Sequence, residues 1–288
     1  MTGSWCPLTF SKRRAGASFF PNSERMVEIS NFGERGVERV RSSPFSLKCS
    51  MNSFNPEDFF DLTDRPAAAL FKDIIHVWDA VAALPAFIEK IFKPEILGEI
   101  EEGAWLEPGR VQLGKGSRIE RGATVRGPTI IGENSVVRTG AYIRGHVMIG
   151  NNCLIGHGTE LRQTLVLDRS NIPHLNCFFT SLVGNQVQIG GDTHTANRLL
   201  NGKQVAIRVS SEGVAQWSST GQVLFGAVIG DDSIVSGGCL LQAGTIIGRR
   251  SLILPQCSIS GYIPNDSLVR PKSAIFEVVP KTKKDSST

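Results

Sequence analysis

The sequence predicts an all-β fold, a parallel β-helix of six-residue repeats with a short N-terminal α-helical cap. The first observation is an aliphatic residue at every sixth position, in the series Leu113, Ile119, Val125, Ile131, Val137, Ile143, Ile149, Ile155, Leu161 and Leu167. The second is a later series with the same spacing, Val223, Ile229, Val235, Leu241, Ile247, Ile253 and Ile259. A mostly small residue follows four positions after each, as at Ser117, Ala123, Cys153 and Cys239. A period of six fits neither an amphipathic helix nor a long alternating strand, whereas it fits a coil of short strands and turns.

Four segments follow from these patterns. We expect residues 1–50 to be a flexible leader or a misassigned start, because they show little periodicity and too many glutamates for a transit peptide. Residues 51–95 are expected to form the helical cap and residues 96–264 the β-helix. Residues 265–288 then form a C-terminal tail.

Apolar spacing within the cap predicts two helices. The first begins near Asp64, with Pro66 in its first turn and one apolar face. The second is short and covers residues 85–92. Both are expected to lie on the larger β-helix.

Composition and charge exclude several classes. The 288 residues are 41% hydrophobic and 20% charged, as in globular domains. The net charge of +4 arises in residues 1–50, so it gives no reason to expect a nucleic-acid partner. The six cysteines form no CxxC pair, which favours reduced thiols in the cytoplasm and no metal site. The apolar runs are too short to span a membrane.

The hexad register breaks twice, which predicts loop insertions near 168–182 and 198–222. The intervals between hexad positions there are sixteen and thirty-four residues, each a whole number of hexads plus four. Insertions in repeat proteins commonly build the binding face. The first break contains His174, and the second contains Asn197 and Lys203.

Three arginines are spaced so that they stack on one another. Arg126, Arg144 and Arg162 are separated by eighteen residues, which is three hexads, and each follows an inward aliphatic residue. Neighbouring coils lie about 4.8 Å apart, as strands do in any sheet. Such a column is either a solvated face with acidic neighbours or a clamp for a phosphate group, for which arginine is well suited.

The segment from Arg144 to Lys203 resembles the acetyltransferase domain of the bifunctional N-acetylglucosamine-1-phosphate uridylyltransferase/glucosamine-1-phosphate acetyltransferases and their archaeal sugar-phosphate relatives. The resemblance extends over residues 110–265. It implies a left-handed β-helix of hexapeptide repeats, against the usual right-handed rule for parallel connections. It also implies that Arg144 and Arg162 bind the phosphate of a sugar.

The resemblance implies roles for further residues. His174, in "PHLN", falls on the family's general base, and Glu160 falls on the glutamate oriented toward that histidine. Asn197, in "HTAN", and Lys203, in "NGK", fall on substrate-binding positions.

Acetyl-CoA is the implied co-substrate, and no metal is needed for acetyl transfer. Backbone N–H groups near Gly191 are expected to hold the oxyanion. Family members bind CoA between coils of adjacent subunits in a homotrimer, which indicates Gly237 and Leu254 as further cofactor-binding residues.

Three residues depart from the family pattern. Cys177 replaces the tyrosine of the "HLxY" motif, Gln188 replaces an asparagine, and Asp192 replaces a glycine. Residues 1–110 contain no counterpart of the glycine-rich nucleotide loop of the uridylyltransferase half. Nucleotide transfer is therefore not expected.

Two functions remain open from the sequence. The first is acetyl-CoA-dependent N-acetylation of an amino-sugar phosphate resembling glucosamine 1-phosphate, in UDP-N-acetylglucosamine-type biosynthesis. The alternative is a non-catalytic trimeric scaffold or a sugar-phosphate-binding regulatory protein. Binding of acetyl-CoA separates the two, because a scaffold has no use for a thioester.

Overall fold

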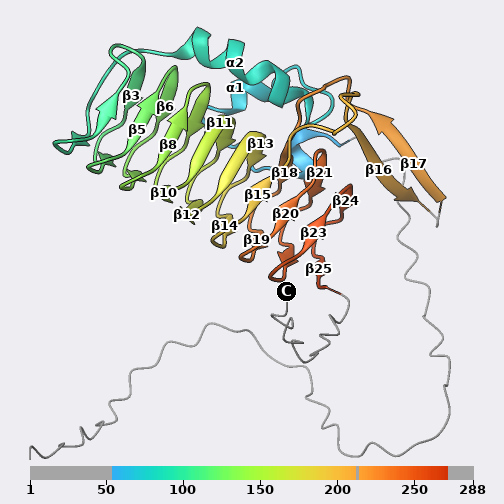
Figure 1. The fold of residues 1–288 in the computed structure, drawn as a ribbon. Helices are drawn as coiled ribbons and strands as arrows, with labels where there is room; N and C mark the ends of the chain where they lie inside the picture. The colour runs from blue at the N-terminus through green and yellow to red at the C-terminus, as the bar shows by residue number, and fades with distance from the viewer. Residues whose placement is uncertain (1–53, 212–213, 272–288) are drawn as a thin grey trace, which may run out of the picture. The chain divides into compact units, whose positions relative to one another are not determined.

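The computed structural model describes residues 54–211 and 214–271 of the chain (Figure 1). The leader expected over 1–50 lies outside these ranges, as do residues 272–288 of the expected tail. The statements below concern the described residues.

The described residues form the predicted left-handed parallel β-helix, whose coils present three faces (Figure 1). The first face contains β1 (Glu99–Ile100), β4 (Arg118–Ile119), β7 (Val136–Val137), β10 (Leu154–His157), β12 (Asn171–His174), β14 (Gln188–Ile189), β19 (Ile234–Val235), β22 (Leu252–Ile253) and β25 (Leu268–Val269). The second contains β2 (Trp105–Leu106), β5 (Thr124–Arg126), β8 (Tyr142–Arg144), β11 (Glu160–Val166), β13 (Cys177–Val183), β15 (His194–Thr195), β20 (Leu240–Leu241) and β23 (Ser258–Ile259). The third contains β3 (Val111–Leu113), β6 (Thr129–Ile131), β9 (Val147–Ile149), β18 (Ala227–Ile229), β21 (Thr245–Ile247) and β24 (Tyr262–Ile263). The long strands β11 and β13 continue from the second face into the third.

The aliphatic hexad residues fill the interior of the coils. Ile119 stacks on Val137 and Val125 stacks on Ile143, eighteen residues apart, and all four are fully buried. The small residues four positions on line a buried corner whose hydroxyl groups bind the backbone of the next coil. Ser117 Oγ, for example, accepts a hydrogen bond of 2.8 Å from the N–H of Ser135.

The loop insertion expected near 168–182 is absent, and that prediction is wrong. Residues 171–174 and 177–183 are the strands β12 and β13, within the coils. The register changes because coils in this region contain seventeen residues, as the pairing of Glu160 with Cys177 demonstrates. A slip of one residue exchanges inside and outside. Val166 therefore faces the interior, and Leu167 packs in the outer apolar cluster.

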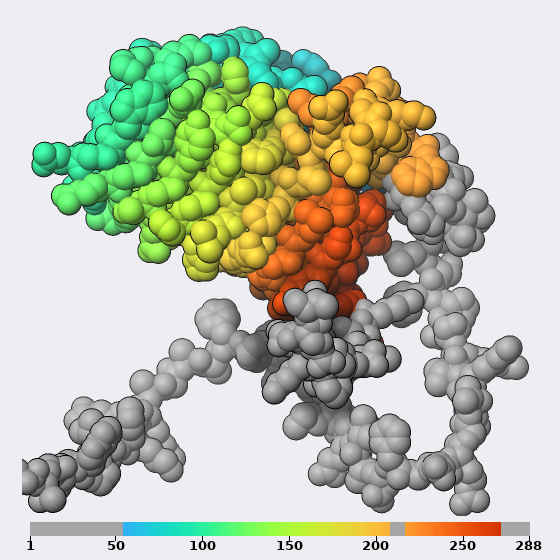
Figure 2. Space-filling view, viewed as in Figure 1, coloured from blue at the N-terminus to red at the C-terminus, as the bar shows by residue number. Residues whose placement is uncertain are grey.

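The insertion expected near 198–222 is present as an antiparallel hairpin. Its strands are β16 (Ala206–Ser211) and β17 (Val214–Ser219), and they project from the side of the coils (Figures 1 and 2). The coils then continue with β18 and extend past the expected boundary at residue 264. Strand β25 lies in the segment that was predicted to be tail.

The cap differs from the predicted pair of helices. It consists of the 3-10 helix η1 (Pro56–Asp58), the short α1 (Ala68–Phe71) and the longer α2 (Asp79–Ile91). Asp64 has a positive φ of 54° and begins no helix. Helix α2 continues through Pro85, where the sequence predicted the start of a second helix.

The cap covers an apolar third face of the coils. Outward residues of that face are buried under the cap, namely Ile130, Met148, Leu165, Leu182, Val228 and Ile246. Cap residues in the same cluster include Phe60, Trp78, Leu84 and Ile88. Because most of this area would otherwise contact water, hydrophobic burial holds the cap in place.

A buried carboxylate adds polar contacts between cap and coils. Asp231, 1% exposed, accepts hydrogen bonds of 2.6 Å from the N–H of Asp61 in the cap and from the N–H of Asn185. Burial raises the pKa of the Asp231 carboxyl, and these hydrogen bonds together with Arg249 oppose that rise. Asp231 therefore joins the cap to the coils through hydrogen bonds to its buried carboxylate.

Replacing Gln163 by alanine is expected to lower the free energy of unfolding by about 1–3 kcal/mol. Pro85 has no N–H, so it leaves the carbonyl of Val81 without its helical partner. The side-chain amide of Gln163 donates to that carbonyl at 3.0 Å. Urea unfolding measures the effect. Gln186→Ala is the matched control, because Gln186 also has positive φ but is exposed, and an equal loss there would contradict the explanation.

Candidate functional site

The candidate site lies at the corner where the first face turns into the second. His157 and His174 are the last residues of β10 and β12, and they occupy equivalent positions on consecutive coils. Both are exposed. His174 therefore ends a strand of the coil and does not sit in an expelled loop.

The arginine column predicted from the spacing is present on the second face. Arg126 and Arg144 are partners on β5 and β8, and Arg162 takes the next position on β11. All three are exposed. Arg144 also lies 5.9 Å from the ring centroid of Tyr142. Within the described ranges, no hydrogen bond or ion pair engages the guanidinium group of Arg162.

Glu160 pairs with Arg144 and not with His174, which corrects the expected orientation. The Nη1 atom of Arg144 lies 2.7 Å from Oε1 of Glu160. Both side chains point outward from adjacent strands of one face, whereas His174 lies around the corner on the following coil. No contact between Glu160 and His174 is found in the described part of the chain.

The imidazole of His174 lies over Gly191 of the next coil. A Cβ atom added to Gly191 would lie 2.6 Å from Cδ2 and 2.9 Å from Nε2 of His174. Any larger residue at position 191 would therefore displace the ring. The absence of a side chain at Gly191 is thus a requirement of the His174 position.

The expected cofactor-binding residues lie along one corner of the coils. Gly191 and Gly237 are adjacent, since the carbonyl of Gly191 accepts a hydrogen bond of 2.9 Å from the N–H of Gly238. Leu254 lies on the following coil, and its carbonyl faces the thiol of Cys239 at 3.4 Å. Glycines at 190, 191, 237 and 238 therefore leave part of the backbone at this corner without side chains.

The two residues expected from the second break lie on the hairpin insertion. Asn197 is at its base, where its carbonyl accepts a hydrogen bond of 2.9 Å from the N–H of Phe225. Lys203 is exposed before β16. Among the described contacts, none joins either residue to His174 or to the arginine column.

A row of polar side chains adjoins His174 on the second face. Cys177 lies between Glu160 on one neighbouring strand and His194 on the other. Nε2 of His194 is 2.9 Å from Oδ1 of Asp192. Burial raises the pKa of the Cys177 thiol, and the negative charges of Glu160 and Asp192 raise it further.

The sequence pattern did not predict that His194 lies beside Cys177. The signal was a separation of seventeen residues between Cys177 and His194, which places them side by side only if the coil has seventeen residues. A coil of eighteen residues would place position 195 beside Cys177. Thr195 is instead buried and points into the coil.

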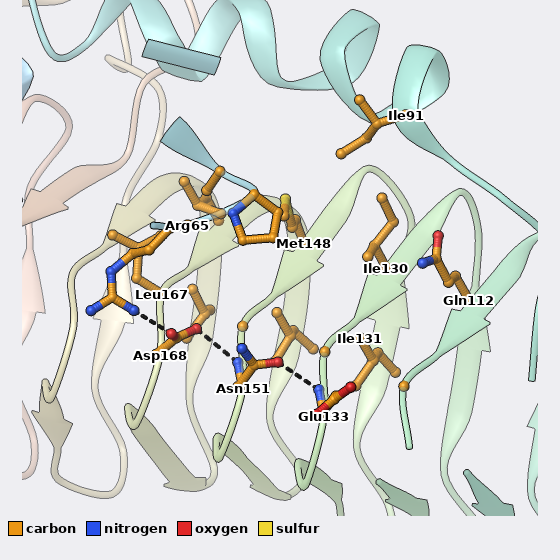
Figure 3. Close-up of a pocket in the computed structure, with 18 of the residues that line it drawn as sticks. Arg65, Ile91, Gln112, Ile130, Ile131, Glu133, Met148, Asn151, Leu167 and Asp168 are labelled. Carbon is orange, nitrogen blue, oxygen red and sulfur yellow. Dashed lines mark hydrogen bonds and ion pairs between the residues drawn. The ribbon is translucent and has the colours of Figure 1, made fainter. Parts of the chain in front are cut away.

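A separate groove lies between the cap and the third face (Figure 3). Its volume is about 700 Å³. Ile130 and Met148 line it from the coils and Ile91 from α2, while Arg65 pairs with Asp168 at one side. This groove is not part of the His174 corner.

Two kinds of feature are absent from the described residues. No group of three or more histidine, cysteine, aspartate or glutamate side chains is placed to hold a metal ion there. No helix in 54–211 or 214–271 is both long and apolar enough to cross a membrane.

One protein family and several curated proteins are similar to this chain. A family model described as the GMPPB C-terminal domain matches residues 125–215. The "Bifunctional protein GlmU" of Methanococcus maripaludis (strain C7) is 36% identical over 205 residues, which are 71% of this chain and 48% of the relative. The protein of the same name from Methanococcus aeolicus is 30% identical over 125 residues, 43% of this chain and 28% of the relative.

Among solved structures, the polySia-specific acetyltransferase NeuO is 14% identical, with 66% of this chain and 88% of that chain covered and a TM-score of 0.35. The chain spans about half the length, 48%, of the Methanococcus maripaludis relative. The sequence comparisons therefore confirm the resemblance of this chain to the hexapeptide-repeat acyltransferases.

Proposed function

We propose that the protein transfers the acetyl group of acetyl-CoA to the amine of an amino-sugar phosphate that resembles glucosamine 1-phosphate. The reaction would supply UDP-N-acetylglucosamine-type biosynthesis in the cytoplasm. The observation that carries the proposal is the exposed arginine column beside the exposed His174 corner.

The arginine column suits a phosphate group. Three guanidinium groups on one face repel one another in the absence of an anion. Glu160 relieves that repulsion only at Arg144, whereas Arg162 is without a described partner. A phosphate monoester accepts bidentate hydrogen bonds from arginine. Asn197 and Lys203, which lie on the hairpin insertion, would bind the substrate as well.

His174 suits the role of general base. An amine attacks a thioester only in its neutral form, so a proton must leave it during the reaction. Imidazole is the side chain best suited to accept a proton from an attacking nucleophile near neutral pH.

The corner formed by Gly191 and Gly237 suits a thioester. Backbone N–H groups without neighbouring side chains allow close approach of the carbonyl and hold the developing oxyanion. Leu254 then lies on the path of the pantetheine arm. Acetyl transfer through this corner requires no metal.

A homotrimer is part of the proposal, and an apolar patch on the first face supports it. Ile234, Leu252 and Leu268 lie on neighbouring strands β19, β22 and β25 and are 45%, 37% and 60% exposed. Contiguous exposed apolar residues on a sheet face are typical of an interface. A second copy of the chain is the partner that such a repeat face fits.

Replacing Leu252 by aspartate is expected to convert the trimer into monomers. A buried charge without a partner costs several kcal/mol at an interface. Light scattering coupled to size exclusion measures the mass in solution. Val136→Asp is the control, because it adds the same charge to the first face on β7, several strands away from the apolar patch. A trimer that persists in Leu252→Asp would place the interface elsewhere.

The function is tested with the full chain, acetyl-CoA and glucosamine 1-phosphate. The expected result is release of free CoA thiol that depends on the sugar phosphate. Omission of the phosphate group, with glucosamine as acceptor, is expected to raise KM strongly because the arginine column then has no ligand. No thiol release and no acetyl-CoA binding by a folded trimer would favour the non-catalytic scaffold or regulator.

A further inference from the structure

We propose that Cys177, His194 and Asp192 form a catalytic triad that takes the acetyl group onto the sulfur of Cys177 before it reaches the amine. This inference rests on the proposed function and adds a covalent step to it. The three residues include two departures from the family pattern and a histidine that the arrangement of the coils brings beside them.

The geometry places the three residues of a nucleophilic triad next to one another, with the hydrogen bond between acid and base formed and the Cys177 thiol on the adjacent strand. Cys177 and His194 are partners on β13 and β15, whose strands lie about 4.8 Å apart as in any sheet. Both side chains point outward, because Phe178 and Thr195, the next residue on each strand, point into the coil. Asp192 lies two residues before His194, and its Oδ1 is 2.9 Å from Nε2 of His194. Base and orienting acid are thus in contact, and the nucleophile lies on the neighbouring strand, where a rotation of its side chain brings the sulfur toward the base.

The hydrogen bond from His194 to Asp192 determines which nitrogen is available. A carboxylate only accepts hydrogen bonds, so Nε2 of His194 carries the proton. Nδ1 of the neutral ring then has the free lone pair. This is the division of roles found when an acid orients a histidine base.

The environment of the thiol explains why a base is needed. Burial and the charges of Glu160 and Asp192 raise the pKa of Cys177, so little free thiolate exists near neutral pH. A thiol in this setting attacks only if its proton is removed during the attack. His194 is the neighbour in position to remove it.

The proposed reaction consists of two transfers of the acetyl group, first to Cys177 and then to the amine. The Cys177 thiol gives its proton to Nδ1 of His194 while its sulfur bonds to the acetyl carbon of acetyl-CoA. The bond from that carbon to the CoA sulfur breaks, and His194 returns the proton to the leaving CoA thiolate. The neutral amine of the acceptor next attacks the thioester on Cys177. His174 accepts the proton of the amine while the bond from the acetyl carbon to the Cys177 sulfur breaks. His174 then gives that proton up to solvent, and the Cys177 thiolate takes one proton from solvent, which restores the thiol and the neutral imidazole.

The roles of the two histidines are therefore different. His194 serves the first transfer and His174 the second. His174 lies on β12, one corner from Cys177, with its ring over Gly191 and next to the start of the Asp192 turn. Loss of His174 is consequently expected to trap the acetyl group on the protein.

The test is to mix the full chain with acetyl-CoA alone, quench it and measure the intact mass and the Cys177 peptide. The expected result is one acetyl group on Cys177 that hydroxylamine removes. Cys177→Ala is expected to carry none, while Cys257→Ala, which changes a cysteine of the coil interior, is expected to carry one. Cys177→Ser is expected to retain a stable ester and to turn over slowly, which guards against a folding defect in the alanine variant.

Asp192 is a positioning residue, and its test is separate. Asp192→Asn is expected to slow acetylation of Cys177 by about a hundredfold or more, in the range of general acid–base effects. Asp192→Glu is expected to restore most of the rate, which a merely structural role would not predict. Equal rates in all three proteins would overturn the assignment of Asp192.

The outcomes separate this inference from the proposed function. Turnover of glucosamine 1-phosphate by Cys177→Ala at the wild-type rate would overturn the covalent step and leave acetyl transfer standing. An acetyl group on Cys177 that never reaches an amino sugar would support the triad and contradict the proposed acceptor. Absence of both reactions would overturn both.

Discussion

Replacing His174 by alanine is expected to lower turnover of acetyl-CoA and glucosamine 1-phosphate by about 10²–10⁴-fold, the range of general base catalysis. The exposed imidazole is placed over Gly191, which has no side chain to displace it. Without it, no described side chain at this position takes the proton of the attacking amine. The assay is release of CoA thiol, with the loss expected in kcat and little change in KM.

His157→Ala is the matched control for this experiment. His157 ends β10 at the equivalent position one coil earlier, and its Nδ1 lies 2.7 Å from the carbonyl of Thr139. It has no role in the proposed reaction, so turnover is expected to stay close to wild type. An equal loss in the two variants would indicate a structural effect of the corner and not a base at His174.

Replacing Trp78 by alanine is expected to lower the free energy of unfolding by about 3–5 kcal/mol, as for other large buried aromatic residues. Trp78 is 2% exposed, stacks on His76 with ring centroids 4.6 Å apart and lies 5.2 Å from Phe54. Its carbonyl also accepts a hydrogen bond of 2.8 Å from Gln222, which ties the cap to the end of the hairpin insertion. The cavity would loosen the cap and wet the apolar third face.

Urea unfolding followed by circular dichroism measures this loss. Ile75→Ala is the control, because Ile75 is 69% exposed in the same segment and its truncation is expected to change stability by less than about 0.5 kcal/mol. A small effect of Trp78→Ala would mean that the coils are stable without a well-packed cap.

The hexad pattern predicted most of the interior of the β-helix, but Leu167 packs in the outer cluster and Val223 is 42% exposed. Each coil buries its aliphatic residue against the same residue of the next coil, so a local period repeats the whole contact. Ile119, Val137 and Ile155 are in the predicted register, and each is fully buried. The arginine column followed from the same arithmetic, because its strands belong to coils of eighteen residues.

The candidate site was less predictable, because it begins where the coil length changes. A shift from eighteen to seventeen residues brings His194 beside Cys177 and turns Leu167 out to the cap. The partner of Glu160 is Arg144, which lies on the adjacent strand. The number of residues between Glu160 and His174 does not reveal which side chains meet across strands.

The sequence by itself determined the repeat, the β-helix with a helical cap, most of the interior residues and the insertion near 198–222, though not that this insertion is a hairpin. These properties depend on periods that are local to the chain. Only the tertiary structure decided the coil of seventeen residues, the passage of α2 through Pro85 and the row of Cys177, His194 and Asp192. Each of these depends on contacts between coils or between cap and coils, such as the hydrogen bond of Gln163 to the carbonyl that Pro85 leaves free.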